Sequence, residues 1–198
     1  MPVITGYNLM PTNLPQELRT ERVLLRRWRP GDREVFAAMT ANPAEMEFFK
    51  CPLTRAESDR TVDAIEAHFN QHGFGLWAME IPGVAPFGGV VGLSTPRFKA
   101  HFTPCVDIAW RVGIDHWGCG YATEAARAVL EFAFDRLDLE EVVSFTATAN
   151  VPSRRVMERL GMTFHPEDDF DHPGLPEGHR LQSHVLYRLR RTNWRGKL

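Results

Sequence analysis

Residues 114–124 read Ile114-Asp115-His116-Trp117-Gly118-Cys119-Gly120-Tyr121-Ala122-Thr123-Glu124. The stretch lies between the longest predicted strand, residues 106–114, and the most regular predicted helix, residues 123–137. Gly118 and Gly120 allow a tight turn and a close approach of the backbone to a ligand. The free N–H groups at a helix start and the helix dipole together favour an anion there. The stretch therefore predicts a phosphate site at a strand-to-helix turn.

Two other phosphate-binding motifs are excluded by the same letters. A P-loop ends in Gly-Lys-Ser/Thr, whereas this run continues as Gly120-Tyr121-Ala122. A dinucleotide fingerprint needs a third small residue where Thr123 stands, and an acidic residue at the end of the next strand. That strand runs instead into Thr148-Ala149-Asn150. A glycine-rich turn that binds nothing remains the alternative.

The elements around this stretch predict an α/β chain. Strands are expected at residues 23–28, 76–81, 88–93, 142–147 and 184–189, and a short helix at residues 153–160. Thr54-Arg55-Ala56-Glu57 is a capping box that opens a longer helix, which Gly73 ends. Hairpin strands precede a β-α-β unit in this order. We therefore expect a mixed sheet with helices on both faces.

The first helix is expected to begin near Asp32. The side chain of Asp32 is predicted to cap the free N–H groups of the first turn. Val35, Phe36 and Met39 recur at helical spacing, so they are predicted to form its buried face.

Length, charge and cysteine content limit the class of protein. The 198 residues suit a single domain, taken as residues 18–190, between an irregular arm at 1–17 and a tail at 191–198. The net charge of −2 gives no general basic surplus for nucleic acid or an anionic membrane. The three cysteines match neither a zinc spacing nor a disulfide framework. With no secretory or membrane-spanning pattern, a cytoplasmic location is expected.

Two signatures carry a resemblance to a known family. Val106-Asp107-Ile108-Ala109-Trp110-Arg111-Val112 followed by residues 117–125 resembles the acetyl-CoA motif of GNAT-superfamily N-acetyltransferases, closest to the RimJ/RimL-like branch. The pattern from Asn150 through Ser153 to Met162 is similar to the second signature of that branch. The resemblance covers roughly residues 18–190. The superfamily motif begins with Gln or Arg where this chain has Trp117, so Trp117 is interpreted as a packing residue.

The resemblance implies both a fold and a reaction. The fold is a GNAT-type α/β fold, a mixed and mostly antiparallel sheet splayed between two central strands. The reaction moves an acetyl group from acetyl-CoA, without a metal, to a primary amine by direct attack. The acceptor is a protein N-terminal α-amine or a small molecule. Many relatives pair as homodimers, and the oligomeric state stays open. The residues carried over for CoA are Gly118, Cys119, Gly120, Tyr121, Ala122 and Thr123 at the phosphates, and Asn150 with the backbone of Trp110, Arg111 and Val112 along the pantetheine arm.

The same resemblance supplies candidate proton carriers. Ser153 matches a serine whose hydroxyl reaches the CoA sulfur, so it is the candidate acid; its alternative role is to cap a helix. A helix cap is likewise the alternative role of Asn150. Asp107 lies where relatives often carry a glutamate, so it is the candidate base; its alternative role is structural. His116 is another candidate base.

The acceptor side is less defined by the sequence. Phe49 and Trp77, with Trp28, are candidates to line the acceptor pocket, although aromatic residues at such positions are often core. The segment from Asp168 to His179 is expected to be a long loop beside the site, and the acidic run at residues 167–172 to attract a cation or to be a solvated loop. His68 and His72 have a metal-ligand spacing on a helix, but a solvated face is favoured because no third ligand is evident.

Two other functions stay open at this stage. One is a non-catalytic module that binds or senses acyl-CoA. The other is an acyltransferase that uses a different donor such as succinyl-CoA, for which Arg111 is the nearby cation.

Overall fold

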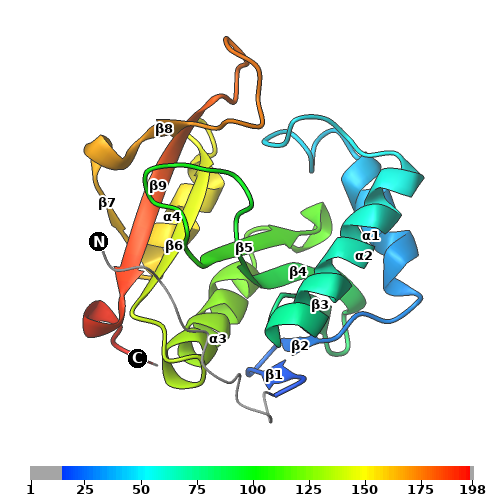
Figure 1. Cartoon of the computed structure of the whole chain (residues 1–198). Helices are drawn as coiled ribbons and strands as arrows, with labels where there is room; N and C mark the ends of the chain where they lie inside the picture. The colour runs from blue at the N-terminus through cyan, green and yellow to red at the C-terminus, as the bar shows by residue number, and fades with distance from the viewer. Residues whose placement is uncertain (1–14, 197–198) are drawn as a thin grey trace.

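The computed structural model describes residues 15–196, so most of the predicted N-terminal arm lies outside the described residues. Within that range the chain forms one sheet of nine strands and four α-helices (Figure 1). The strands are β1 Leu18–Arg19, β2 Leu24–Arg26, β3 Leu76–Ile81, β4 Ala85–Ser94, β5 Asp107–Val112, β6 Glu141–Ala147, β7 Thr163–Phe164, β8 Phe170–Asp171 and β9 Ser183–Arg190. The helices are α1 Asp32–Ala41, α2 Arg55–His72, α3 Tyr121–Asp135 and α4 Val151–Arg159.

The sheet is antiparallel except at its centre. The strand order is β1-β2-β3-β4-β5-β6-β9-β7, with β8 paired to β9. β5 and β6 are parallel and share a single register pair, Asp107 with Val143. Beyond that pair the two strands diverge, as Figure 1 shows, above the start of α3. The predicted mixed, mostly antiparallel and splayed sheet is confirmed.

Helices cover both faces of the sheet, as expected. Ala78 of β3 and Val90 of β4 are register partners, and they pack in a cluster with Phe36 of α1. The next residues along the same strands, Trp77 and Val91, belong to the large core that contains the buried face of α3. Because neighbouring strand residues point to opposite faces, α1 and α3 lie on opposite sides of the sheet.

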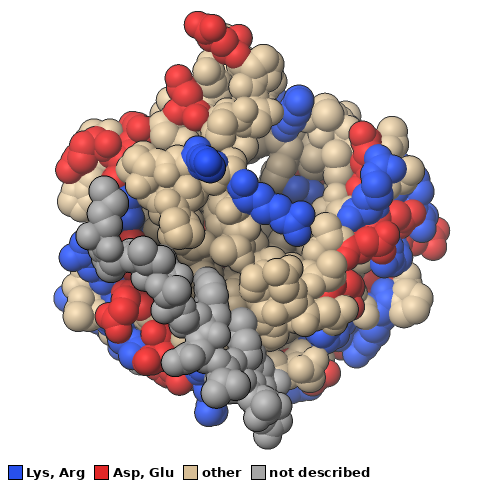
Figure 2. Space-filling model, viewed as in Figure 1, with Lys and Arg blue, Asp and Glu red and all other residues tan. Residues whose placement is uncertain are grey.

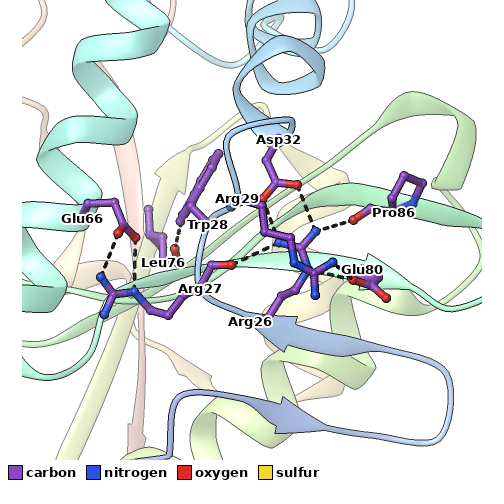
Figure 3. A network of polar contacts seen from close by, with 9 residues as sticks. All are labelled: Arg26, Arg27, Trp28, Arg29, Asp32, Glu66, Leu76, Glu80 and Pro86. Atoms are coloured by element: carbon purple, nitrogen blue, oxygen red, sulfur yellow. Dashed lines mark hydrogen bonds and ion pairs between the residues drawn. The ribbon is translucent and has the colours of Figure 1, made fainter.

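α1 begins at Asp32, as predicted, but its cap differs from the prediction. Gly31, not Asp32, is the N-cap, and no side chain caps the helix. The Asp32 carboxylate instead accepts two hydrogen bonds from buried Arg26, which also donates to Glu80 and to the Pro86 carbonyl (Figure 3). A buried guanidinium demands several acceptors, and this demand outweighs the capping preference of Asp32. The network fixes α1 to β2 and β3.

The predicted buried face of α1 is also partly wrong. Phe36 and Met39 are buried, but Val35 is 42% exposed. Phe36 and Met39 lie three positions apart and share the stripe that faces the sheet, whereas Val35 falls outside it.

The second helix follows its sequence closely. The Thr54 hydroxyl accepts from the Glu57 N–H, and the Glu57 carboxylate accepts from the Thr54 N–H, which completes the capping box. Gly73 ends the helix in the left-handed conformation. This geometry explains why the helix begins and ends where it was predicted to.

Residues placed in the predicted tail pack against the domain. Arg191 donates a backbone hydrogen bond to Glu140, and the Trp194 ring lies 5.8 Å from the Phe134 ring of α3.

Cys51, Cys105 and Cys119 are all free thiols. In residues 15–196 no helix is both long and apolar enough to span a bilayer.

Candidate active site

The glycine turn before α3 has the geometry predicted for an anion site. Gly118 and Gly120 adopt φ of +75° and +84°, in the left-handed region that glycine tolerates. Gly120 is the N-cap of α3, and no side chain caps that helix. Among the described residues, no N–H from Gly118 to Thr123 donates a hydrogen bond. These donors converge on one place with the positive end of α3, so the turn can bind a phosphate.

The turn is held in place from two sides. Arg22 donates to the Cys119 carbonyl and forms an ion pair of 2.6 Å with Glu124 in the first turn of α3. Trp117 donates from Nε1 to the Val112 carbonyl over 2.6 Å, which fastens the turn to β5. Trp117 is 51% exposed, so its predicted packing role is replaced by a hydrogen-bonded one. Arg22 was not predicted, because nothing local links residue 22 to residue 119.

The divergence of β5 and β6 leaves backbone groups of β5 unpaired on one side. The Gly113 N–H donates to the carbonyl of Gly88 in the neighbouring strand β4. Along an antiparallel strand, the N–H groups of successive residues point alternately to one side of the strand and to the other. The N–H groups of Ala109 and Arg111 therefore point to β4, whereas those of Trp110 and Val112 point towards β6. The predicted pantetheine contacts thus fit the backbone of Trp110 and Val112. The Arg111 N–H points away from β6, which contradicts the backbone contact with pantetheine expected for this residue. Arg111 lines both cavities through its side chain instead.

Two adjoining cavities open at this divergence. The larger cavity, about 520 Å³, is lined by the glycine turn and by α4. The smaller cavity, about 380 Å³, lies between α1, α2, β5, β6 and the loop before β9. Of the predicted phosphate-binding run, Gly118, Gly120, Tyr121, Ala122 and Thr123 line the larger cavity, and Cys119 does not. The two cavities share Phe48, Phe49, Trp110, Arg111, Asn150 and Ser153.

Asp107 lies at the wall of the smaller cavity, where β5 and β6 still pair. The residue is 6% exposed, and its carboxylate accepts a hydrogen bond of 2.6 Å from the Ser94 hydroxyl. Burial raises the pKa of Asp107 to about 6, against the lowering by that hydrogen bond. A carboxyl group with this pKa can take up a proton near neutral pH.

The start of α4 separates the roles of Asn150 and Ser153. Asn150 is the cap: its Oδ1 accepts from the Ser153 N–H over 3.2 Å, and its Nδ2 donates to the Thr146 hydroxyl over 2.9 Å. The cap role predicted as an alternative for Ser153 is therefore filled by Asn150. Ser153 lies in the first turn of the helix, at the border of both cavities. Its hydroxyl is available for a role at the site.

The three aromatic residues predicted to line the acceptor pocket lie in different environments. Phe49 lines both cavities, and its role in binding the acceptor stays a prediction. Trp77 is 0% exposed and packs between Phe69 and Phe132, so its predicted place in the acceptor pocket is wrong. Trp28 packs against core aromatic rings and donates to the Leu76 carbonyl (Figure 3). Trp77 of β3 belongs to the core, and Trp28, in the loop after β2, packs against it, so neither residue lines a cavity.

The segment after β7 borders the smaller cavity, as expected. His172, Gly174, Leu175 and Leu181 line that cavity. The acidic run does not present a free carboxylate at Asp168, because Arg188 binds this group over 2.7 Å and lowers its pKa to about 2. An attraction of Asp168 for a cationic acceptor is therefore not supported.

The predicted metal spacing has another explanation. The His68 ring bonds the Phe74 carbonyl and the Thr95 hydroxyl through its two nitrogens. Within residues 15–196 no group of three His, Cys, Asp or Glu side chains is placed to hold a metal. His116, the other candidate base, lines the larger cavity beside the glycine turn.

Several lining residues escaped the sequence reasoning. Phe48 and Lys50 follow α1 in a turn-rich segment, and Glu45 of the same segment lines the larger cavity. Arg155 and Arg159 of α4 line it too, one helical turn apart. Basic residues at this spacing on an exposed helix were the only available signal, and that pattern is common on solvated helices.

Known proteins share this architecture and these sequence patterns. Over 128 residues the chain is 34% identical to FsC-acetyl coenzyme A-N(2)-transacetylase of Aspergillus fumigatus, a match to 62% of this chain and 52% of that protein. This chain thus spans about half the length of that relative. It is 26% identical over 153 residues to the protein YkkB of Bacillus subtilis, covering 77% and 88% of the two chains. The crystal structure of an acetyltransferase from Agrobacterium tumefaciens superposes with a TM-score of 0.73 at 26% identity, covering 93% of this chain and 99% of that one.

A family model described as the acetyltransferase (GNAT) domain matches residues 22–163, which include the glycine turn, both central strands and the start of α4. That span is most of the chain. With the splayed sheet and the uncapped start of α3, the match shows that this chain belongs to the GNAT acetyltransferase family.

Proposed function

We propose that the chain is an N-acetyltransferase that moves an acetyl group from acetyl-CoA to a primary amine by direct attack. The observation that carries the proposal is that three features form one continuous site. N–H groups without partners at the start of α3 are followed by unpaired backbone groups on β5, and the cavity that they line meets the second cavity at Ser153. GNAT acetyltransferases take acetyl-CoA as co-substrate, and the Aspergillus relative is named for it.

In this proposal the larger cavity holds CoA. The pyrophosphate lies on the N–H groups of Gly118 to Thr123, and the pantetheine arm lies along Trp110 and Val112 between β5 and β6. Arg155 and Arg159 of α4 add positive charge to the wall of this cavity. The free N–H of Trp110 or Val112 polarises the thioester carbonyl, in the manner of an oxyanion hole.

The acceptor amine enters from the smaller cavity. Asp107 takes a proton from the acceptor ammonium, directly or through water, because its raised pKa suits a base near pH 7. The amine nitrogen then attacks the thioester carbon and the C–S bond breaks, while the Ser153 hydroxyl gives its proton to the departing thiolate. The nitrogen, which is positively charged after the attack, loses its second proton to solvent and becomes a neutral amide. Ser153 recovers a proton from solvent. Its position at the border of both cavities supports this role.

The acceptor is a small amine or a protein N-terminal α-amine. The smaller cavity, about 380 Å³, has room for one or two amino-acid residues but not for a folded surface. We place the chain with RimJ/RimL-like enzymes on the two sequence signatures, from residues 106–125 and 150–162.

The test is release of free CoA thiol when the chain is mixed with acetyl-CoA and a panel of small amines and short peptides. Thiol release that depends on the amine is the expected result. Binding of acetyl-CoA without release for any acceptor points to a binding or sensing module instead. If acetyl-CoA does not bind at all, the proposal is wrong from its first step.

A further inference from the structure

Arg111 is a cation held in the site without adequate partners. Its guanidinium carbon lies 3.8 Å from the centroid of the Phe49 ring and 5.6 Å from that of Phe36. The Nε and Nη1 atoms are shielded from solvent, and neither has a hydrogen-bond partner among the described residues. An arginine has five N–H donors, and leaving buried donors unpaired is costly. Such a cost is typical of a group kept for a ligand.

A structural arginine elsewhere in the chain has hydrogen-bond acceptors for its donors. Arg26 is buried, and it is bound by Asp32, Glu80 and the Pro86 carbonyl (Figure 3). Arg111 has one acid nearby, Glu45, which raises the pKa of Arg111 while burial lowers it to about 10. The two side chains form no ion pair in the described part of the chain, and Glu45 Oε2 is itself buried without a partner. Glu45 therefore does not satisfy Arg111.

The surroundings of Arg111 favour an anion from the acceptor side. Arg111 and Asp107 are four residues apart on β5, so both side chains point to the α1 face and line the smaller cavity. Lys50 lines the same cavity. In Figure 2 the visible face is hollowed near its centre, and the charged atoms that border the hollow are those of Lys or Arg, with the acidic atoms farther out.

We propose that the acceptor is an amine that also carries a carboxylate, and that Arg111 binds this carboxylate in the smaller cavity. The guanidinium fork pairs with two carboxylate oxygens at once, and the aromatic walls of Phe36 and Phe49 exclude water from the pair. Asp107, four residues away on the same face of β5, then takes the proton from the amine end of the acceptor. The inference rests on the proposed acetyltransferase reaction and names the class of its acceptor.

Paired acceptors test this inference. Glycine, β-alanine, γ-aminobutyrate and 5-aminopentanoate are each compared with their carboxamides at saturating acetyl-CoA, with thiol release as the readout. For at least one length, kcat/KM for the acid is expected to exceed that of the amide about tenfold to a hundredfold, which matches a hydrogen-bonded charge pair. Equal rates for acids and amides at every length overturn the inference.

Variants assign the preference to one side chain. Arg111→Met, which keeps the apolar stem and removes the fork, is expected to abolish the preference for the acid. Arg33→Met is the matched control, because Arg33 pairs with Asp63 on the α1–α2 surface and lines neither cavity. A preference that survives in Arg111→Met contradicts the inference.

Thermal unfolding gives a readout that does not depend on activity. Because Nε and Nη1 of Arg111 have no hydrogen-bond partner among the described residues, Arg111→Met is expected to keep or raise Tm in the absence of ligands. A marked fall in Tm shows a structural arginine and argues against the inference. If the methionine variant does not fold, Arg111→Lys, which keeps the charge but loses the fork, is expected to weaken the preference while conserving the fold.

Two outcomes separate this inference from the reaction on which it rests. Turnover of carboxylate-free amines alone overturns the acceptor class and leaves the acetyltransferase intact. Absence of acetyl-CoA binding overturns the reaction itself. Faster thiol release from succinyl-CoA than from acetyl-CoA, lost in Arg111→Met, moves the carboxylate to the acyl group and contradicts its place on the acceptor.

Discussion

Asp107 is the residue whose environment sets the pH range of the proposed reaction. Its pKa is raised to about 6, so the basic form is present above that pH. We expect kcat/KM to fall with unit slope as pH drops below about 6, because this parameter follows ionisation of the free enzyme. Asp107→Asn is expected to lose about 10²-fold or more in kcat/KM and to lose that slope. A pH profile unchanged by Asp107→Asn contradicts its role as base.

The same carboxyl group should also make stability depend on pH, but stability should fall as pH rises, whereas activity should rise. The folded chain holds the proton of Asp107 more tightly than the unfolded chain, whose pKa is near 3.8. Folding therefore takes up a proton between pH 3.8 and about 6, and the contribution of Asp107 to the free energy of unfolding falls as pH rises through that window. Asp107→Asn removes this dependence. The difference in Tm between the two proteins, followed across pH, measures it.

Ser153 and Asn150 make separable contributions to the start of α4. Ser153→Ala is expected to lower kcat about 10²-fold or more and to leave Tm unchanged, because the cap belongs to Asn150. Asn150→Ala is expected to cost about 1 kcal/mol of stability through loss of that cap. Urea unfolding and steady-state kinetics on both variants give the two numbers. A large stability loss in Ser153→Ala with unchanged kcat reverses the assignment.

At the scale of the element, β5 depends on a close approach by β4. Gly89 has φ of +146°, and a Cβ built there lies 2.2 Å from the Arg111 carbonyl oxygen. Gly89→Ala is therefore expected to cost about 1–3 kcal/mol of unfolding free energy and to weaken acetyl-CoA binding by displacing β5. Gly31→Ala is the control, since nothing lies within 4 Å of its added Cβ. Equal stability of the two variants in urea shows that β4 and β5 tolerate a wider spacing.

Elements with strong local signals could be predicted from the sequence. The capping box at Thr54, the left-handed glycines at 118 and 120, and the periodic face of α3 act through neighbours in the chain. Strands β1, β7 and β8 have two residues each, too few to show a period. Trp77 was misassigned because both cavity walls and core use aromatic residues. The isolation of Arg111 depends on distant side chains, so no local pattern reveals it.

At the scale of the whole molecule, the sheet has two parts that meet at one parallel pair, Asp107 with Val143. A ligand laid between β5 and β6 contacts both parts, so it stabilises the folded chain by mass action. Acetyl-CoA at 100 times its Kd is expected to add about 2.7 kcal/mol, which raises Tm by roughly 5–10 °C for a domain of this size. Thermal unfolding with and without acetyl-CoA measures the shift. A Tm that does not move argues that the cleft does not bind the donor.

The central claim is that the start of α3 anchors the donor through its phosphates. A calorimetric titration of the chain with acetyl-CoA, repeated with S-acetylpantetheine, tests it most directly, because the second compound keeps the thioester arm and lacks the pyrophosphate. We expect one site per chain for acetyl-CoA and affinity at least about a hundredfold weaker for S-acetylpantetheine, since two or more charge-assisted N–H bonds are lost. Equal affinity for the two compounds, or no heat with either, contradicts phosphate binding at the start of α3.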